Sequence, residues 1–129
     1  MSENFNIEII SPEKKLLTDK VNSATIPSFD GEMTILANHI SLITFLRPGI
    51  ITINGNKEIK YFLEEGTVEF SNNNLTILSS TIVECSALSK ETISKMIEDS
   101  KNQLNKDNLN DKTRYILSHK IDCLSRINL

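Results

Sequence analysis

Residues 50–63 read IITINGNKEIKYFL, and this stretch indicates the fold of the first part of the chain. Two apolar runs, Ile50–Ile53 and Ile59–Leu63, flank the turn sequence Asn54-Gly55-Asn56. Asn-Gly supplies the positive φ angles of a tight hairpin turn. The two runs are therefore predicted to pair as antiparallel strands.

Short apolar runs of the same kind lie on both sides of this hairpin. Near the N-terminus, Phe5, Ile7 and Ile9 alternate with polar residues, which is the period of a half-buried strand. Turn signals such as Pro48-Gly49 separate the runs. About eight to ten short strands with regular turns predict a β-sandwich or barrel. The further runs are Leu16–Leu17, Val21–Ile26, Met33–Leu36, Ile40–Leu46, Val68–Phe70, Leu75–Leu78 and Thr81–Cys85.

The period becomes helical near Leu88, and Gly and Pro no longer occur beyond it. Ser89 is predicted to cap a first helix, because its hydroxyl can accept from the free N–H groups of the first turn. Leu88 and Ile93 have the spacing of a hydrophobic staple across this cap. The apolar face of the helix continues through Met96, Ile97 and Leu104.

A polar break at Asn105–Asn110 precedes a second helix, which Asn110 or Asp111 is expected to cap. Two helices of about 16 residues joined by a short loop are expected to lie antiparallel. Their apolar stripes are thin, so the pair must pack on the sandwich or on another protein. The stripe of the second helix is Ile116, Leu117, Ile121, Leu124 and Ile127.

Composition excludes several classes of function. The net charge is −3 and aromatic residues make up 5%, without Trp, which disfavours binding to nucleic acid. Residues 1–4 lack the basic start of a signal peptide, and no apolar run approaches the ~20 residues of a membrane span. Cys85 and Cys123 are expected to be free thiols in a reducing compartment, with a disulfide as the alternative.

Groups that carry chemistry are scarce. The sequence has no GxxxxGK[ST] or GxGxxG motif, and neither His39 nor His119 has a Cys or a second His at a ligand spacing. We therefore expect no catalytic residue, no metal and no cofactor. Cys85 is interpreted as a buried structural thiol, with a Cys–His pair assembled in space as the alternative. His39, in a loop, either hydrogen-bonds its own turn or contacts a partner protein.

An ordered set of residues resembles the epsilon-subunit family of bacterial ATP synthases, called delta in mitochondria. The set covers about residues 5 to 88. The resemblance implies a ten-stranded β-sandwich of two sheets in residues 1–86, followed by an antiparallel helical hairpin in residues 87–129. The set is Ile10-Ser11-Pro12-Glu13-Lys14, Ile26-Pro27, Gly31-Glu32, Ile35-Leu36, His39, Leu42-Ile43-Thr44, Leu46, Pro48-Gly49-Ile50, Gly66-Thr67-Val68-Glu69 and Leu75-Thr76-Ile77-Leu78.

The resemblance also implies a function and partners. Such a chain is a non-catalytic subunit of the rotor stalk, which couples the membrane-embedded c-ring to the gamma subunit at the cytoplasmic face of the bacterial inner membrane. By position, Glu32 would face the c-ring and His39 would face gamma. The sequence departs from the family at Thr34, where Gly is common, and at Ala37-Asn38, where Pro-Gly or Pro-Asn is common.

The helical hairpin implies regulation, because in the family it can rise along gamma and block ATP hydrolysis or fold down on the sandwich. Some members bind ATP through Ile/Leu-Asp-x-x-Arg-Ala in the first helix. Here Ile93–Glu98 lacks the Asp and Arg, and Ile121–Arg126 in the second helix has its Arg one place late. We therefore expect weak or no ATP binding.

Three basic residues of the second helix, Arg114, Lys120 and Arg126, either meet acidic surfaces of the alpha and beta subunits during inhibition or form a solvated face. A rival interpretation of the whole chain is a small-ligand-binding β-sandwich with a helical lid. That rival predicts an enclosed pocket with convergent polar groups. The interaction hypothesis predicts an exposed apolar patch instead.

Overall fold

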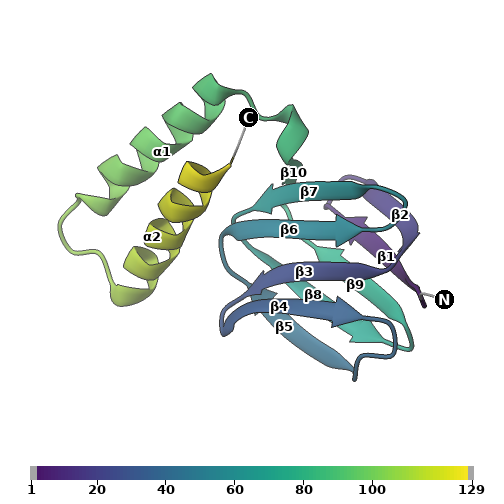
Figure 1. The fold of residues 1–129 in the computed structure, drawn as a ribbon. Coiled ribbons are helices and arrows are strands. Elements are labelled where there is room, and N and C mark those ends of the chain that lie inside the picture. Colours follow the sequence, from purple (N-terminus) through teal and green to yellow (C-terminus); the bar gives the residue numbers. More distant parts are fainter. Residues whose placement is uncertain (1–2, 128–129) are drawn as a thin grey trace.

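The computed structural model describes residues 3–127, and it contains ten strands, one short 3-10 helix and two α-helices (Figure 1). The strands come first in the chain and the α-helices last, as the change of period near Leu88 predicts. The elements are β1 (Phe5–Ile10), β2 (Lys15–Val21), β3 (Ser23–Ser28), β4 (Gly31–Leu36), β5 (Leu42–Leu46), β6 (Gly49–Asn54), β7 (Glu58–Leu63), β8 (Gly66–Ser71), β9 (Asn74–Leu78), β10 (Val83–Glu84), η1 (Cys85–Ala87), α1 (Lys90–Leu104) and α2 (Asp111–Arg126).

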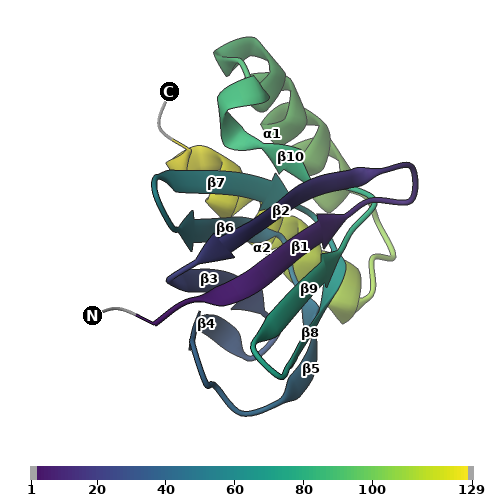
Figure 2. The same cartoon turned by 90° about the vertical axis from the view of Figure 1, so that its right-hand side faces the viewer.

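The strands form two packed layers (Figure 2). One layer has the order β4-β3-β6-β7-β10 and the other β5-β8-β9-β1-β2. Neighbours pair antiparallel, except β1 and β9, which are parallel. The layers are continuous at one edge, where Ser28 of β3 pairs with Leu46 of β5. The predicted sandwich followed by a helical hairpin is confirmed.

Alternating apolar residues of both layers fill the space between them. Ile7 and Ile9 of β1 and Ile51 of β6 are completely buried. Phe5 and Phe70 meet edge to face, with ring centroids 5.6 Å apart. Each such side chain contributes on the order of 1.5–3 kcal/mol through burial. Because a close-packed interior has little free volume, this body transmits force with little deformation.

The hairpin of β6 and β7 forms as predicted, but its turn differs from the expectation. Asn54 pairs with Glu58, which leaves a three-residue loop, and neither Asn54 nor Gly55 has a positive φ. The prediction of positive φ angles there was wrong. Space around Gly55 is limited instead, since a Cβ there would lie 3.2 Å from Cγ1 of Val21 and 3.3 Å from the carbonyl oxygen of Lys20.

The two-residue turn of the expected kind joins β8 and β9 instead. Asn72 and Asn73 have φ angles of 51° and 58°, between the paired residues Ser71 and Asn74. Consecutive residues with positive φ match the right-handed twist of the flanking strands, and Asn tolerates that conformation well.

The helix caps are confirmed. The side chain of Ser89 accepts a hydrogen bond from the backbone N–H of Thr92, and that of Asn110 accepts one from Thr113. Leu88 and Ile93 pack in the same cluster, as the predicted staple requires. α1 has 15 residues and α2 has 16, close to the expected length.

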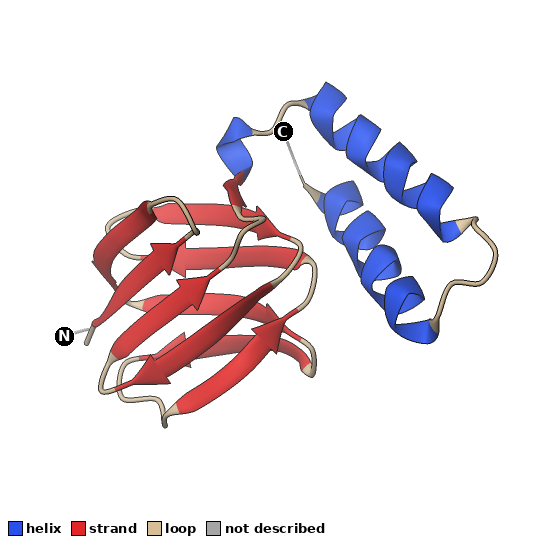
Figure 3. Ribbon diagram, turned by 180° about the vertical axis from the view of Figure 1, so that it is seen from behind, coloured by secondary structure: helices blue, strands red, loops and turns tan. Residues whose placement is uncertain are grey.

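The helical hairpin lies folded down beside the sandwich, and α2 is the helix that faces it (Figures 1 and 3). A second apolar cluster, here called the hairpin core, joins the two parts. Its center is Phe62 of β7, which is 1% exposed and packs with Leu124 of α2. Leu88 and Ile93 complete the buried set, and Cys85 and Cys123 lie at its margin.

Candidate partner-binding surfaces

Large apolar side chains are exposed on β4, on β5, in the turns beside these strands and at the end of β9. Ile43 and Phe45 of β5 are 76% and 65% exposed, because the inner face of the strand carries Leu42, Thr44 and Leu46. Six such residues are called the apolar patch. Phe29, Phe45 and Leu78 lie together along one groove, and contiguous exposed apolar groups of that kind mark sites of contact with other proteins. The patch consists of Phe29, Leu36, Ile40, Ile43, Phe45 and Leu78.

Three patch residues, Phe29, Phe45 and Leu78, line an open groove of about 1200 Å³. Carboxylates border it at Asp30, Glu64 and Glu65, and the start of α2 contributes Lys112 and Ile116. This is a surface groove between the sandwich and α2, and it lacks the enclosed shape that the rival small-ligand hypothesis predicts. An apolar floor with an acidic border suits a protein surface that carries apolar and basic side chains.

The structure places Glu32 and His39 at opposite ends of β4. Glu32 is exposed and lies opposite Pro27 of β3. His39 follows the strand and is half-buried, with its Nδ1 2.7 Å from the carbonyl oxygen of Ile40 and its ring edge to face with Phe70. The imidazole therefore bonds within its own turn, which is the first of the two alternatives given for His39. The same turn carries Ile40, which is exposed.

The loop before His39 is fixed by Asn38. Its φ of 67° is left-handed, a conformation that Asn adopts more easily than most residues. Its backbone N–H donates to Oδ1 of Asn73 at 2.6 Å, and Nδ2 of Asn73 donates back to Oδ1 of Asn38 at 3.0 Å. The departure from the family pattern at Ala37-Asn38 is thus accommodated by a reciprocal amide pair that ties two loops together.

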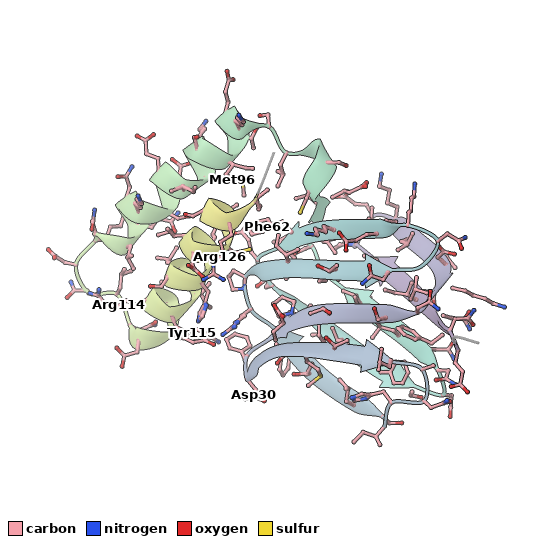
Figure 4. All side chains as sticks on the ribbon, in the orientation of Figure 1. Asp30, Phe62, Met96, Arg114, Tyr115 and Arg126 are labelled. Atoms are coloured by element: carbon pink, nitrogen blue, oxygen red, sulfur yellow. The ribbon has the colours of Figure 1, made fainter. Side chains whose placement is uncertain are left out.

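The three basic residues of α2 that the sequence analysis singles out have different surroundings; Arg114 and Arg126 are labelled in Figure 4. Lys120 forms an ion pair with Glu64 at the end of β7, Nζ to Oε1 2.5 Å, and its side chain is 16% exposed. Arg126 pairs with Asp122 one turn earlier on the same helix, at 3.2 Å. Arg114 is exposed. Lys120 therefore holds α2 to the sandwich in this conformation, whereas Arg114 and Arg126 lie on the outer surface.

A polar cluster that the sequence analysis missed also joins α2 to the sandwich. Nη1 of Arg47, in the turn before β6, donates to Oη of Tyr115 at 3.0 Å and lies 3.3 Å from Nε2 of His119. Oη of Tyr115 donates to the carbonyl oxygen of Phe29 at 3.1 Å, and the two rings stack. Tyr115 and His119 are four residues apart on a helix and so share one face, the only sequence signal for this cluster.

The pKa values of His119 in this cluster and of the two cysteine thiols are shifted from their usual values. Burial and the nearby Arg47 guanidinium hold the pKa of His119 below its usual 6.5, while Asp122 acts in the opposite direction. Burial, with nearby Cys85 and Asp122, raises the pKa of Cys123 to about 12, against a smaller opposing effect of Arg126. Burial also raises the pKa of Cys85, although Lys60 lowers it. Both cysteines are free thiols.

The described residues show no group of three His, Cys, Asp or Glu side chains that could hold a metal ion. Among the helices described, none has the length and apolar character needed to cross a membrane.

Comparison with known proteins gives one consistent result. Residues 4–85 match the family model of the beta-sandwich domain of the ATP synthase delta/epsilon chain. The ATP synthase epsilon chain of Pelagibacter ubique is 42% identical over 130 residues, covering 99% of this chain and 100% of the relative. That of Allorhizobium ampelinum is 34% identical, covering 99% and 96%.

Solved structures share the fold. A chain in the Euglena gracilis mitochondrial ATP synthase assembly of OSCP, F1 and c-ring has a TM-score of 0.79 at 19% identity, covering 95% of this chain and 79% of that chain. A chain in the central stalk and c-ring of the Tetrahymena thermophila mitochondrial ATP synthase has a TM-score of 0.66 at 14% identity, covering 97% and 96%.

Proposed function

Because this chain belongs to the ATP synthase delta/epsilon family, we propose that it is a non-catalytic subunit of the central stalk that couples the c-ring to the gamma subunit. The sandwich of residues 1–86 is the binding body, and the helical hairpin of residues 87–129 is the regulatory part. The solved relatives that share the fold come from assemblies described as containing a c-ring or a central stalk.

The apolar patch is the observation that carries the proposal. Ile43 and Phe45 expose most of their apolar surface to water, at 76% and 65%. Burying such side chains against a partner contributes on the order of 1.5–3 kcal/mol each. Gamma is the proposed occupant of the patch and groove, and its contact surface should carry apolar and basic residues that complement Phe45, Asp30 and Glu65.

Glu32 remains the proposed contact for the polar loops of the c-ring, and His39 a proposed contact for gamma. The support for Glu32 is its exposed position on β4, beside the turn of Phe29 and Asp30. The support for His39 is that its turn lies next to Ile40, which is 79% exposed. A peripheral position at the cytoplasmic face of the bacterial inner membrane belongs to the same proposal.

The hairpin is proposed to regulate ATP hydrolysis by leaving its docked position and reaching the alpha and beta subunits through Arg114 and Arg126. The docked form described here depends on the hairpin core and a few polar contacts, including Lys120 with Glu64. Such an interface can open without unfolding of the sandwich, because its contacts are separate from those of the sandwich core. We expect weak or no ATP binding, since the first helix lacks the Asp and Arg of the ATP-binding segment.

Reconstitution with the other subunits of the same complex in vesicles tests this function. The full chain should restore ATP-driven proton pumping to a complex depleted of it. A chain ending at residue 88 should also restore pumping but alter the rate of ATP hydrolysis. Failure of the full chain to restore pumping would refute the coupling role, whereas an unchanged hydrolysis rate after truncation would refute only the regulatory role.

A further inference from the structure

The contact between α2 and the turn before β6 contains a bond that depends on protonation. Nη1 of Arg47 lies 3.3 Å from Nε2 of His119. A guanidinium group only donates hydrogen bonds and stays charged at every ordinary pH. Nε2 of His119 can therefore take part only as an acceptor, which requires a neutral imidazole with its proton on Nδ1.

Protonation of His119 removes this bond and adds a repulsion. The imidazolium carries an N–H at both nitrogens, so a donor would face the donor of Arg47. Two positively charged groups would then have nitrogen atoms about 3.3 Å apart in a partly buried contact. The same Nη1 donates to Tyr115, whose ring meets that of His119 at 4.4 Å, so displacement of the imidazole also disturbs the bond from Tyr115 to Phe29.

Other charged groups nearby modify the effect without cancelling it. On α2 itself, Asp122 favours the protonated form of His119, and Lys120 pairs with Glu64, which directly follows β7. Arg126 pairs with Asp122 at 3.2 Å, which draws part of that negative charge away from His119. Arg47 is the charged group of the sandwich that lies against the imidazole.

From this geometry we propose that His119 and Arg47 form a proton-sensitive latch: the helical hairpin stays docked while His119 is neutral and is released as His119 takes up a proton. The state favoured by acid is the undocked one, because the imidazolium is then separated from Arg47 and solvated. The latch is a property of the chain by itself, and it holds whether or not the chain couples a c-ring to gamma.

The pKa of His119 agrees in sign with this latch. Its value in the docked state lies below the usual 6.5, because of burial and Arg47. The undocked state therefore binds the proton more readily. Docking is at full strength well above pH 6.5, weakens as the pH falls through 6.5, and stops weakening below the docked pKa. Each unit by which docking lowers the pKa weakens docking about tenfold.

Hydrogen exchange of the full chain, read by NMR as protection factors corrected for intrinsic exchange at each pH, tests the latch. Between pH 7.5 and 5, the protection factors of α2 amides should fall by up to about tenfold for each unit by which docking lowers the pKa of His119. The protection factors of amides in β1 and β9 should stay constant over the same range. The variant His119→Gln should remove the pH dependence, because glutamine stays neutral. The matched control His39→Gln should retain it.

A direct titration of the His119 ring signal in the unmodified chain is the second measurement, and it is informative even if His119→Gln fails to dock. A midpoint clearly below 6.5 supports the latch, and a midpoint at or above 6.5 overturns it. An equal loss of α2 protection in His119→Gln, or constant protection in the unmodified chain, also overturns it.

Discussion

Lys120 of α2 and Glu64 at the end of β7 meet with Nζ and Oε1 2.5 Å apart, and this ion pair crosses from the helical hairpin to the sandwich. The side chains are 16% and 37% exposed, so the pair is only partly screened by solvent. It lies at one side of the interface that the hairpin core fills, and the Arg47 cluster provides the other polar contacts. The position of the hairpin is thus set by charged and apolar contacts together.

Replacing Glu64 with Gln should loosen the docked hairpin modestly. An ion pair of limited exposure contributes at most about 1 kcal/mol, so the population of open hairpin should rise by up to about fivefold. The measurement is the alkylation rate of Cys123, read from its peptide by mass spectrometry. Glu65→Gln is the control, because Glu65 is the adjacent carboxylate and should leave the rate unchanged. Equal alkylation rates in the two variants would contradict the role of the Lys120–Glu64 ion pair in holding the hairpin docked.

Replacing Phe62 with Ala should undock the hairpin much more strongly. Phe62 is 1% exposed in the hairpin core, and truncation of a buried Phe costs about 3–5 kcal/mol. Alkylation of Cys123 should accelerate by about a hundredfold or until the hairpin is fully open. Phe70→Ala, in the sandwich core, should lower the free energy of global unfolding by a similar amount. Continued protection of Cys123 in Phe62→Ala would contradict docking of the hairpin through the hairpin core.

Replacing Asn38 should separate two contributions to the stability of the loop that carries His39, namely the left-handed backbone conformation and the side-chain hydrogen bonds. Asn38→Gly keeps the left-handed φ of 67° accessible but loses the amide bonds of the side chain, while Asn38→Ala loses both. We expect a fall in unfolding free energy of about 1 kcal/mol for Gly and about 1 kcal/mol more for Ala. Urea denaturation measures both. A variant Asn38→Ala as stable as Asn38→Gly would show that the backbone conformation is not strained.

The caps of both helices could be predicted from the sequence, because Ser89 and Asn110 act within one helical turn. The left-handed turn was assigned to Asn54-Gly55 instead of Asn72-Asn73, since both pairs suit a hairpin and only strand register distinguishes them. The Arg47 cluster could not be predicted. Arg47 is 68 residues from Tyr115 and 72 from His119, and no local rule brings such residues together.

Ionisation of Cys123 should lower the stability of the folded chain at alkaline pH. The pKa of Cys123 is raised to about 12 in the folded chain, so the unfolded chain loses this proton at lower pH. The contribution of Cys123 to stability is constant below about pH 8.5 and falls as the pH rises from there toward 12. Urea denaturation between pH 7 and 10 should show this decline. Cys123→Ser should reduce it, and an unchanged slope would contradict the buried position of the thiol.

The affinity of the full chain for the gamma subunit of its own complex tests the central claim most directly. The unmodified chain should bind gamma, and Phe45→Asp in the apolar patch should weaken binding at least about thirtyfold, as loss of a central contact does. Thr18→Asp, on the exposed face of β2, should bind as the unmodified chain does. Absence of binding by the unmodified chain, or equal affinity of Phe45→Asp, would contradict the account.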